Sequence, residues 1–400
     1  MKDQRWILPE GIEEVAPPRA HELEMLRREL VDLYATWGYR LIMPPMVEYL
    51  ESLLVGSASD LNLDTVKFVD QVSGRMMGIR ADMTPQAARI DAHHFHTDAP
   101  VRLCYLGTVL HARPDAFGGT RSPLQVGCEL YGHDGAESDA EIIALVLATL
   151  RTTGIADFWI DLGHVGVFRE LASHAGLDRR AEETLFDMLQ RKARPEMAEY
   201  LAGRVSARNA QMLLALVELN GDASVLDDAA TALADAGDGA LAALAELRAV
   251  ATTVMQDNPD VNLHFDLAEL RGYQYQTGVV YAAFVPGVGR EVARGGRYNE
   301  IGSVFGRARP ATGFSADLKT LLIAGSRAGA VEKSTIYAPA DSDPQLRQRI
   351  VELRAAGEPV LRALPGQHGG ALEIGCTREL KRGGDGWQVV HVSQPSGRSG

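Results

Sequence analysis

The sequence predicts an α+β fold, in which an antiparallel sheet is flanked by helices and is followed by a small C-terminal α/β domain. Polar and apolar residues alternate in the segment 156–163, which is the period of a half-buried strand, and strand signals return at 277–285. Residues from about 165 to 255 are rich in Ala, Leu, Glu and Arg and poor in strand signals, so we expect a helical insertion there. The chain is accordingly divided into a core, residues 1–330, and a second domain, residues 331–400.

The first half of the core supplies two helix signals and one extended segment. Apolar residues at spacings of three and four predict an amphipathic helix over residues 19–37 that ends before Gly38. Residues 39–51 are expected to be extended as far as Pro44-Pro45. Ser138 and Glu141 have the spacing of a capping box, so a second helix is expected to begin at Ser138. The face of the first helix is Leu23, Leu26, Leu30, Leu33 and Trp37.

The later segments continue this pattern. Strands are expected at 262–267 and 277–285, and residues 312–325 have the pattern of a strand that runs into a helix. In the second domain we expect a strand at 334–340, a helix at 343–357 and a last strand at 387–393. The tail, residues 394–400, has a composition typical of disorder.

Composition limits the location and the class of partner. The longest apolar run, 142–150, is far shorter than the ~20 residues of a membrane span, and the N-terminus lacks an apolar signal core. The three cysteines show no C-x-x-C spacing, which favours a reducing cytoplasm over a disulfide framework or a zinc site. A net charge of −13 argues against nucleic acid, although a local basic patch can override it. The histidines of 93–96 suggest a metal, but a solvated helix end is favoured.

Three polar segments suggest a binding pocket. Asp82 and Thr84 follow an apolar strand, and Gln125 and Glu129 face the same side of an extended strand. Residues 267–278 carry one acid, an arginine, two tyrosines and a threonine at every second position. Each segment alone is better explained as the solvated edge of an antiparallel sheet. Together they supply acids for an ammonium group, an arginine for a carboxylate and an amide for an imidazole, which is the set that a free amino acid requires.

Two glycine-containing segments have two interpretations each. The segment 111–123 contains Arg113 and Arg121, and it either folds over an anionic or polar ligand or forms a hairpin loop with solvated arginines. The segment 295–299, "GGRYN", is either a ligand-facing turn or a tight connection that needs glycine. A Walker-type loop, a G-x-S-x-G elbow and an H-E-x-x-H helix are all missing from the sequence.

In their order, these segments resemble histidyl-tRNA synthetase, a class II aminoacyl-tRNA synthetase, from about residue 5 to 325. "WGYRLIMPPMVE" resembles the first class motif, with the motif proline at Pro45, and residues 105–132 resemble the second. "GIRADMTPQAAR" is similar to the family's "LRPEGT" segment, and "LAELRGYQYQTGVVY" to its histidine-specific signature. "GGRYN" is similar to "GGRYD", and "PATGFSADLKTLL" to the third motif. The resemblance implies a class II synthetase-like sheet and a histidine pocket, with no cofactor and no metal. The pocket residues that it implies are Asp82, Thr84, Arg113, Arg121, Gln125, Glu129, Arg271, Gly272, Tyr275 and Gln276.

The chain departs from the synthetase pattern where ATP is bound. Leu110 and Ala112 stand in place of the second motif's Arg-x-Glu, and Lys319 and Thr320 in place of the third motif's Glu-Arg. In the family these arginines hold the phosphates of ATP, and stabilisation of charge is usually the largest catalytic contribution. The C-terminal piece is also shorter than the family's anticodon-binding domain. We therefore expect neither adenylate formation nor tRNA binding.

A retained histidine pocket without the ATP arginines resembles the regulatory subunits of ATP phosphoribosyltransferase. That resemblance implies a non-catalytic, cytoplasmic protein that homodimerises and joins a short-form catalytic subunit, commonly as a hetero-octamer. It also implies a role in the first step of histidine biosynthesis, with feedback by L-histidine. The alternatives are an active histidyl-tRNA synthetase or another class II-like ligase, and both require the ATP that the two substitutions disfavour.

Overall fold

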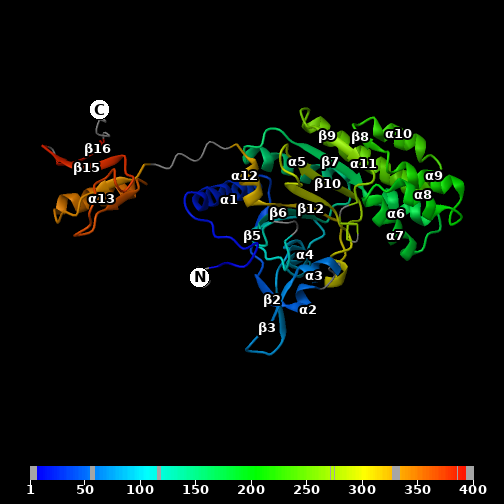
Figure 1. The fold of residues 1–400 in the computed structure, drawn as a ribbon, viewed down its shortest axis with the longest axis horizontal. Helices are drawn as coiled ribbons and strands as arrows, with labels where there is room; N and C mark the ends of the chain where they lie inside the picture. The colour runs from blue at the N-terminus through cyan, green and yellow to red at the C-terminus, as the bar shows by residue number, and fades with distance from the viewer. Residues whose placement is uncertain are drawn as a thin grey trace. The chain divides into compact units, whose positions relative to one another are not determined.

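The structure is a computed structural model that describes residues 7–54, 59–114, 119–270, 272–273, 275–326, 334–384 and 386–392. The chain divides into two compact units, residues 1–327 and 328–400, and each is described here by itself (Figure 1). The domain boundary expected at residue 330 and the whole of the expected disordered tail, residues 394–400, fall outside the described residues.

In the larger unit, the described residues form a nine-stranded sheet of order β1-β5-β6-β12-β11-β10-β7-β9-β8 (Figure 1). Neighbours from β5 through to β7 are antiparallel, as predicted, whereas β1 pairs with β5 and β7 with β9 in parallel. The strands are β1 (Arg40–Ile42), β5 (Val101–Thr108), β6 (Leu124–Tyr131), β7 (Trp159–His164), β8 (Asn220–Gly221), β9 (Leu263–Asp266), β10 (Val279–Phe284), β11 (Ala293–Arg297) and β12 (Ala311–Asp317).

The two faces of this sheet have different surroundings. Along β6, Val126, Cys128 and Leu130 point into the main apolar core, where they meet the helices α1 (Arg19–Thr36), α5 (Ala136–Thr152), α11 (Asp238–Asp257) and α12 (Leu318–Ala324). Gln125 and Glu129 alternate with these residues and so lie on the opposite face. The polar face therefore lies away from the helices of the main core.

Two local predictions in the first half were wrong. The apolar face of α1 ends at the buried Tyr34, whereas Trp37 follows the helix and is 36% exposed. Helix α5 begins at Ala136, with Gly135 as its N-cap, so Ser138 lies inside the first turn. The Ser138 hydroxyl donates to the Gly135 carbonyl, and Glu141 bonds Arg102 and Tyr39 instead of capping the helix. The capping-box residues are thus used by tertiary contacts.

The predicted helical insertion is mainly helical, and all of its residues are described. A short strand, β8, interrupts it and pairs with β9. Helix α7 has Asp178 as its N-cap, whose carboxylate accepts from the Ala181 amide at 2.8 Å. Its helices are α6 (Val165–His174), α7 (Arg179–Gln190), α8 (Arg194–Leu201), α9 (Ala207–Ala215), α10 (Val225–Ala232) and α11.

The unit also contains a smaller sheet, of order β2-β4-β3, whose strands precede helix α4 in the sequence. Pro85 stands in the first turn of α4, where a missing N–H costs nothing. The exposed His93 and His94 end that helix, and within the described residues no group of His, Cys, Asp or Glu is arranged to hold a metal. The elements are β2 (Val47–Tyr49), α2 (Leu50–Leu53), α3 (Ser59–Asp64), β3 (Val66–Val69), β4 (Met76–Ile79) and α4 (Thr84–His94).

The smaller unit has its own sheet and core. Helix α13 (Pro344–Ala355) packs Leu346 and Ile350 against Ile336 and Leu380 of the sheet. The sequence predicted β13, α13 and β16 but missed two strands, β14 and β15. The sheet has the order β14 (Val360–Arg362), β13 (Ile336–Ala338), β15 (Arg378–Gly383), β16 (Gly386–His391). Among the residues that the structure describes, no helix is both long and apolar enough to span a bilayer.

Candidate ligand-binding site

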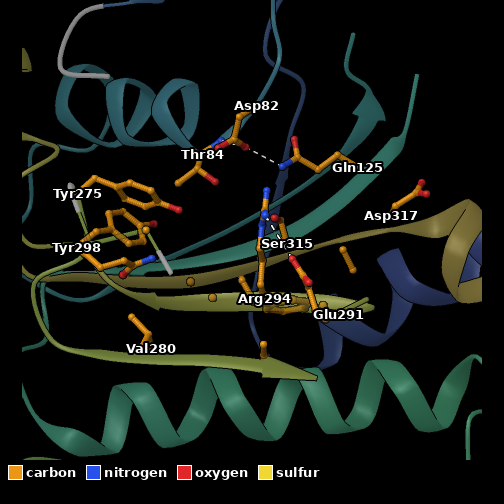
Figure 2. Close-up of a pocket in the computed structure, with 18 of the residues that line it drawn as sticks. Asp82, Thr84, Gln125, Tyr275, Val280, Glu291, Arg294, Tyr298, Ser315 and Asp317 are labelled. Carbon is orange, nitrogen blue, oxygen red and sulfur yellow. Dashed lines mark hydrogen bonds and ion pairs between the residues drawn. The ribbon is translucent and has the colours of Figure 1, made fainter. Parts of the chain in front are cut away.

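A cavity of about 670 Å³ opens on the polar face of the large sheet. Its volume lies in the range of small-molecule sites. Figure 2 shows polar side chains from several strands and loops directed toward this space, while a helix runs along the other side of the strands. The residues of the predicted pocket that line it are Asp82, Thr84, Gln125, Glu129, Gly272, Tyr275 and Gln276.

At one side of the cavity, Asp82 and Gln125 hold each other in place. The Gln125 amide donates from Nε2 to Oδ1 of Asp82 at 2.6 Å, and its oxygen accepts from the Met83 amide at 2.9 Å. The Thr84 amide donates to the same Asp82 oxygen at 3.1 Å (Figure 2). All three contacts use Asp82 Oδ1 or the Gln125 amide, so among the described residues Oδ2 of Asp82 remains available to a ligand.

Glu129 is the most deeply buried acid of the cavity, with an exposed fraction of 1%. Tyr105 donates its hydroxyl hydrogen to Oε1 at 2.8 Å, and Tyr298 donates to Oε2. Burial raises the pKa of Glu129 to about 8, although the two tyrosine hydrogen bonds act in the opposite direction. A carboxyl with this pKa can change its protonation state near neutral pH when a ligand arrives.

Glycines make room for these side chains. A Cβ atom on Gly313 would lie 1.6 Å from Oε2 of Glu129, and one on Gly127 would lie 2.5 Å from the Tyr105 hydroxyl. Gly127 pairs directly with Tyr105 in the β5–β6 register, and Gly313 pairs with Glu129 in the β12–β6 register. The floor of the cavity therefore depends on strand positions that have no side chain.

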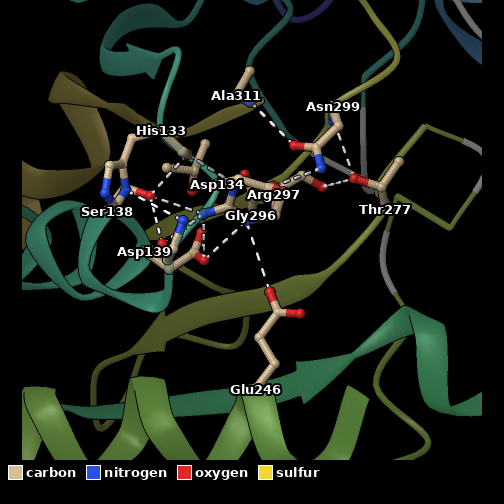
Figure 3. A network of polar contacts seen from close by, with 12 residues as sticks. His133, Asp134, Ser138, Asp139, Glu246, Thr277, Gly296, Arg297, Asn299 and Ala311 are labelled. Carbon is tan, nitrogen blue, oxygen red and sulfur yellow. Dashed lines mark hydrogen bonds and ion pairs between the residues drawn. The ribbon is translucent and has the colours of Figure 1, made fainter. Parts of the chain in front are cut away.

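In the "GGRYN" segment, Gly295, Gly296 and Arg297 are the end of strand β11, and Tyr298 and Asn299 follow the strand. Arg297 is buried on the helix side, where its Nε and Nη2 donate to Oδ2 of Asp139 at 2.9 and 2.7 Å (Figure 3). Its neighbour Tyr298 lines the cavity and donates to Glu129. Arg297 thus anchors the strand to α5, while Tyr298 takes part in the site.

The histidine-specific segment also differs from its expected form. Between β9 and β10, Gly272, Tyr273 and Tyr275 lie in turns, and no described residue of 269–277 belongs to a strand, so the period-two pattern does not reflect a strand. Gly272 has a φ of +68°, a backbone conformation that glycine adopts without strain. Gln276 is buried, and its Oε1 has no hydrogen-bond partner in the described part of the chain. Arg271, the predicted carboxylate ligand, lies outside the described residues.

The other two predicted arginines are not brought to the cavity. Arg113 is exposed, and it is not among the residues that line the cavity in the described chain. Arg121 donates from Nε to the His111 carbonyl at 3.0 Å and from Nη1 to the Glu10 carbonyl. Its guanidinium joins the N-terminal segment to the loop before β6, and it does not line the cavity either.

The positions of the lost ATP arginines have other partners. Thr320 accepts a hydrogen bond from Arg290 at 2.8 Å, and its hydroxyl donates to Asp317 at 2.7 Å. Lys319 turns to Glu13 and to the Ser122 carbonyl, at 2.9 and 2.8 Å. At position 110, the Leu110 amide donates to the Arg80 carbonyl. None of these three residues offers a cation to a nucleotide phosphate from the motif positions.

Sequence reasoning missed several residues that line or support the cavity. A glycine between Gln125 and Glu129 was the signal for a large side chain on a neighbouring strand, and that side chain is Tyr105. Tyr298 could have been found from its place two residues after the adjacent glycines Gly295 and Gly296 of β11. The remaining residues have no local signal, because only the fold brings them to this face. They are Phe186, Arg290, Glu291 and Arg294, whereas Tyr273 was one of the period-two residues of the segment 267–278.

Comparison with known proteins agrees with this geometry. The histidyl-tRNA synthetase family profile matches residues 11–321, and that of the "ATP phosphoribosyltransferase subunit HisZ C-terminal domain" matches residues 333–390. The "ATP phosphoribosyltransferase regulatory subunit" of Thioalkalivibrio sulfidiphilus is 58% identical over 379 residues, covering 94% of this chain and 96% of the relative. The protein of the same name from Alkalilimnicola ehrlichii is 53% identical, covering 96% and 97%.

Solved structures show the same fold. A Bacillus halodurans structure described as an "ATP phosphoribosyltransferase regulatory subunit/histidyl-tRNA synthetase" has a TM-score of 0.81 at 27% identity, covering 93% of this chain and 96% of that one. Histidyl-tRNA synthetase from Nostoc has a TM-score of 0.76 at 21% identity, covering 95% and 92%. The predicted class II synthetase-like fold is thereby confirmed. The chain belongs to the family of ATP phosphoribosyltransferase regulatory subunits.

Proposed function

We propose that this regulatory subunit binds free L-histidine in the cavity on its sheet and thereby controls a short-form catalytic ATP phosphoribosyltransferase, the enzyme of the first step of histidine biosynthesis. As a member of a family of regulatory subunits, the chain is not itself the catalyst. The observation that carries the proposal is the pair of carboxyl groups, Asp82 and Glu129, which line one cavity on the same face of the sheet.

The groups of the cavity match those of histidine one by one. Asp82 has an oxygen free of the Gln125 contact, and with Thr84 it can accept hydrogen bonds from an ammonium group. Two tyrosines hold the carboxyl of Glu129 in one orientation. In its ionised form, this group can accept a hydrogen bond from an imidazole N–H. The sequence resemblance assigns the carboxylate of histidine to Arg271, which can bind it through two parallel hydrogen bonds.

The same site is unsuited to adenylate formation. Thr320 and Leu110 replace the phosphate-binding arginines, and Lys319 is engaged by Glu13. The net charge of −13 is also unfavourable for a polyanionic RNA. These features support a protein that keeps the histidine pocket and binds no tRNA, so an active synthetase and a class II-like ligase are the less favoured functions.

We further infer that the chain forms a homodimer within a hetero-oligomer, a hetero-octamer being the arrangement that the family resemblance implies, and that it works in the cytoplasm. Support for self-association comes from the edge of the large sheet. Leu41 of the edge strand β1 and the following Met43 and Met46 are apolar and exposed, with Met43 at 81%. Apolar side chains grouped at an unpaired strand edge are typical of an interface.

The proposal is tested on the complex with the short-form catalytic subunit, assayed with and without L-histidine. We expect the chain to co-purify with that subunit and to make its activity sensitive to histidine. Asp82→Asn should raise the histidine concentration required for inhibition by about ten- to a hundredfold, since a hydrogen bond to a charged group is worth about 1.5–3 kcal/mol. Asp32→Asn, an exposed change on α1, is the matched control. Equal inhibition of both variants would place the sensing site elsewhere.

A further inference from the structure

The ligand cavity is walled in part by the helical insertion. Phe186 belongs to α7, and it lines the cavity together with Tyr273 of the turn segment between β9 and β10. The two rings are stacked, with centroids 4.9 Å apart and planes 24° apart. A helix that lies some ninety residues before the signature segment therefore contributes directly to the surface that a ligand meets.

Tyr273 makes several contacts to the helical insertion. Its hydroxyl donates to Oε1 of Glu182, one turn before Phe186 on the same helix α7. Phe168 of α6 packs against its ring at 5.5 Å, and the Arg169 guanidinium lies 4.8 Å from the ring centroid. Tyr273 is only 9% exposed, so its side chain is packed between the helical insertion and the rest of the unit.

The backbone of the same segment is held by the same helices. Arg169 Nη2 donates to the carbonyls of Tyr273 and Gln276 at 3.0 and 3.1 Å. At the end of α7, Gln190 donates to the Ala268 carbonyl at 3.2 Å, and Lys192 pairs with Asp266 at 2.7 Å. Side chains of α6, of α7 and of Lys192 just after α7 thus contact the segment that also contributes Glu269, Gly272, Tyr273, Tyr275 and Gln276 to the wall of the cavity.

We infer that Tyr273 is a positioning residue that couples the occupancy of the cavity to the helical insertion through its contacts with Glu182 and Phe186. The inference rests on the proposed binding of histidine. A ligand that fixes the wall at Gly272, Tyr275 and Gln276 also fixes Tyr273, because Tyr273 lies within the same short turn segment. Helix α7 is then held by its stacking and hydrogen bond to that tyrosine. Coupling of two sites is reciprocal, so loosening α7 must weaken the ligand.

The test measures hydrogen exchange of the full chain by mass spectrometry, with and without L-histidine, together with calorimetric histidine affinity. In the wild type, histidine should slow exchange in peptides of 179–190 as well as in those of 263–282. Tyr273→Phe keeps the ring stack and removes the hydroxyl, and Glu182→Gln replaces the acceptor with a near-isosteric amide. Each should weaken histidine binding by about five- to tenfold and remove the protection of α7.

The chain supplies a matched control one residue away. Glu183→Gln makes the same chemical change on the same helix, but Glu183 pairs with the exposed Arg179 instead of with Tyr273. This variant should bind histidine and protect α7 as the wild type does. The double variant Tyr273→Phe/Glu182→Gln should be no weaker than either single variant, since both remove the same contact.

Three outcomes separate the two proposals. Loss of α7 protection in Tyr273→Phe and Glu182→Gln, but not in Glu183→Gln, supports the coupling. Tight histidine binding by the wild type with unchanged exchange in α7 overturns the coupling and leaves the proposed function standing. If the wild type binds no histidine, the proposed function fails, and the coupling fails with it.

Discussion

Tyr298 at the end of β11 donates its hydroxyl hydrogen bond to Glu129 of β6, across the intervening strand β12. The two side chains meet over Gly313, which pairs with Glu129 on one side and with Gly296 on the other. This position has no side chain, so the tyrosine and the carboxylate can approach each other above the sheet. The arrangement fixes the acid that we assign to the imidazole of histidine.

Gly313→Ala should therefore disrupt the site. Its Cβ would lie 1.6 Å from Oε2 of Glu129, within a floor that cannot move without shifting β6 or β12. We expect a loss of about 1–3 kcal/mol in the free energy of unfolding, as for other overpacked cores, and loss of histidine binding. Urea denaturation and calorimetry measure the two effects.

Gly289→Ala serves as the control for this substitution. Gly289 lies in the β10–β11 connection, and a Cβ there meets nothing within 4 Å. Wild-type stability and affinity in both alanine variants would contradict the role assigned to Gly313.

The stability of the empty protein should depend on the protonation of Glu129. Its folded-state pKa is about 8, above the value of about 4.5 for an exposed glutamate, so the folded state binds the proton more strongly. The contribution of this group is fully present below pH ~4.5 and is lost as the pH rises to about 8. The slope is at most about 1.4 kcal/mol per pH unit. Glu129→Gln should flatten this part of the profile.

To check this expectation, denaturation midpoints of the wild type and of Glu129→Gln are measured between pH 5 and 8, and the difference between them is followed with pH. Glu14→Gln, which changes an exposed carboxylate in the N-terminal segment, controls for the loss of one acid. A profile of Glu129→Gln that parallels the wild type would show that the group is already ionised in the folded protein.

Arg271→Ala should weaken the binding of L-histidine by about ten- to a hundredfold, since the carboxylate would lose a charged, two-hydrogen-bond partner. Arg113→Ala is a matched control, because Arg113 is exposed and is not among the lining residues that the structure describes. Calorimetry of the isolated chain decides between them. Equal affinities in the wild type and both variants would assign the carboxylate to another group.

Histidine-dependent pyrophosphate exchange with ATP should stay at background. Removing one group that stabilises developing charge typically costs about 2.7–4 kcal/mol, and here two phosphate-binding arginines are replaced. As a control, the same preparation of the chain is tested for its ability to activate a short-form catalytic phosphoribosyltransferase. Exchange at a synthetase-like rate would overturn the assignment of a regulatory role.

Met43→Asp should convert the isolated chain from a dimer to a monomer, because it places a charge among the exposed apolar residues after β1. Sedimentation velocity measures the change. Met255→Asp alters a methionine that is 36% exposed on α11, away from this strand edge, and should leave the dimer intact. A wild type that sediments as a monomer at all concentrations would remove the basis of this prediction.

The sequence alone determined the features that depend on local period and on motif order. The spacing of Leu23, Leu26 and Leu30 fixed the buried face of α1, since a helix repeats every 3.6 residues. The four-residue spacing of Gln125 and Glu129 placed both on one side of β6 for the same kind of reason. The ordered motifs identified the family, and the two lost arginines separated it from the active synthetases.

Only the tertiary structure decided the surroundings of those side chains. Glu129 and Tyr298 are separated by 169 positions in the sequence. The order of the strands in the sheet brings them together, and no local pattern encodes that order. The helix signal at Ser138 failed because Arg297 and neighbouring carbonyls use the serine hydroxyl. The contact of Phe186 with Tyr273 likewise exists only because the insertion folds back on the sheet. Periodicity fixes which way a side chain faces, whereas packing between distant elements decides what it meets there, and hence the pKa of Glu129 and the shape of the cavity.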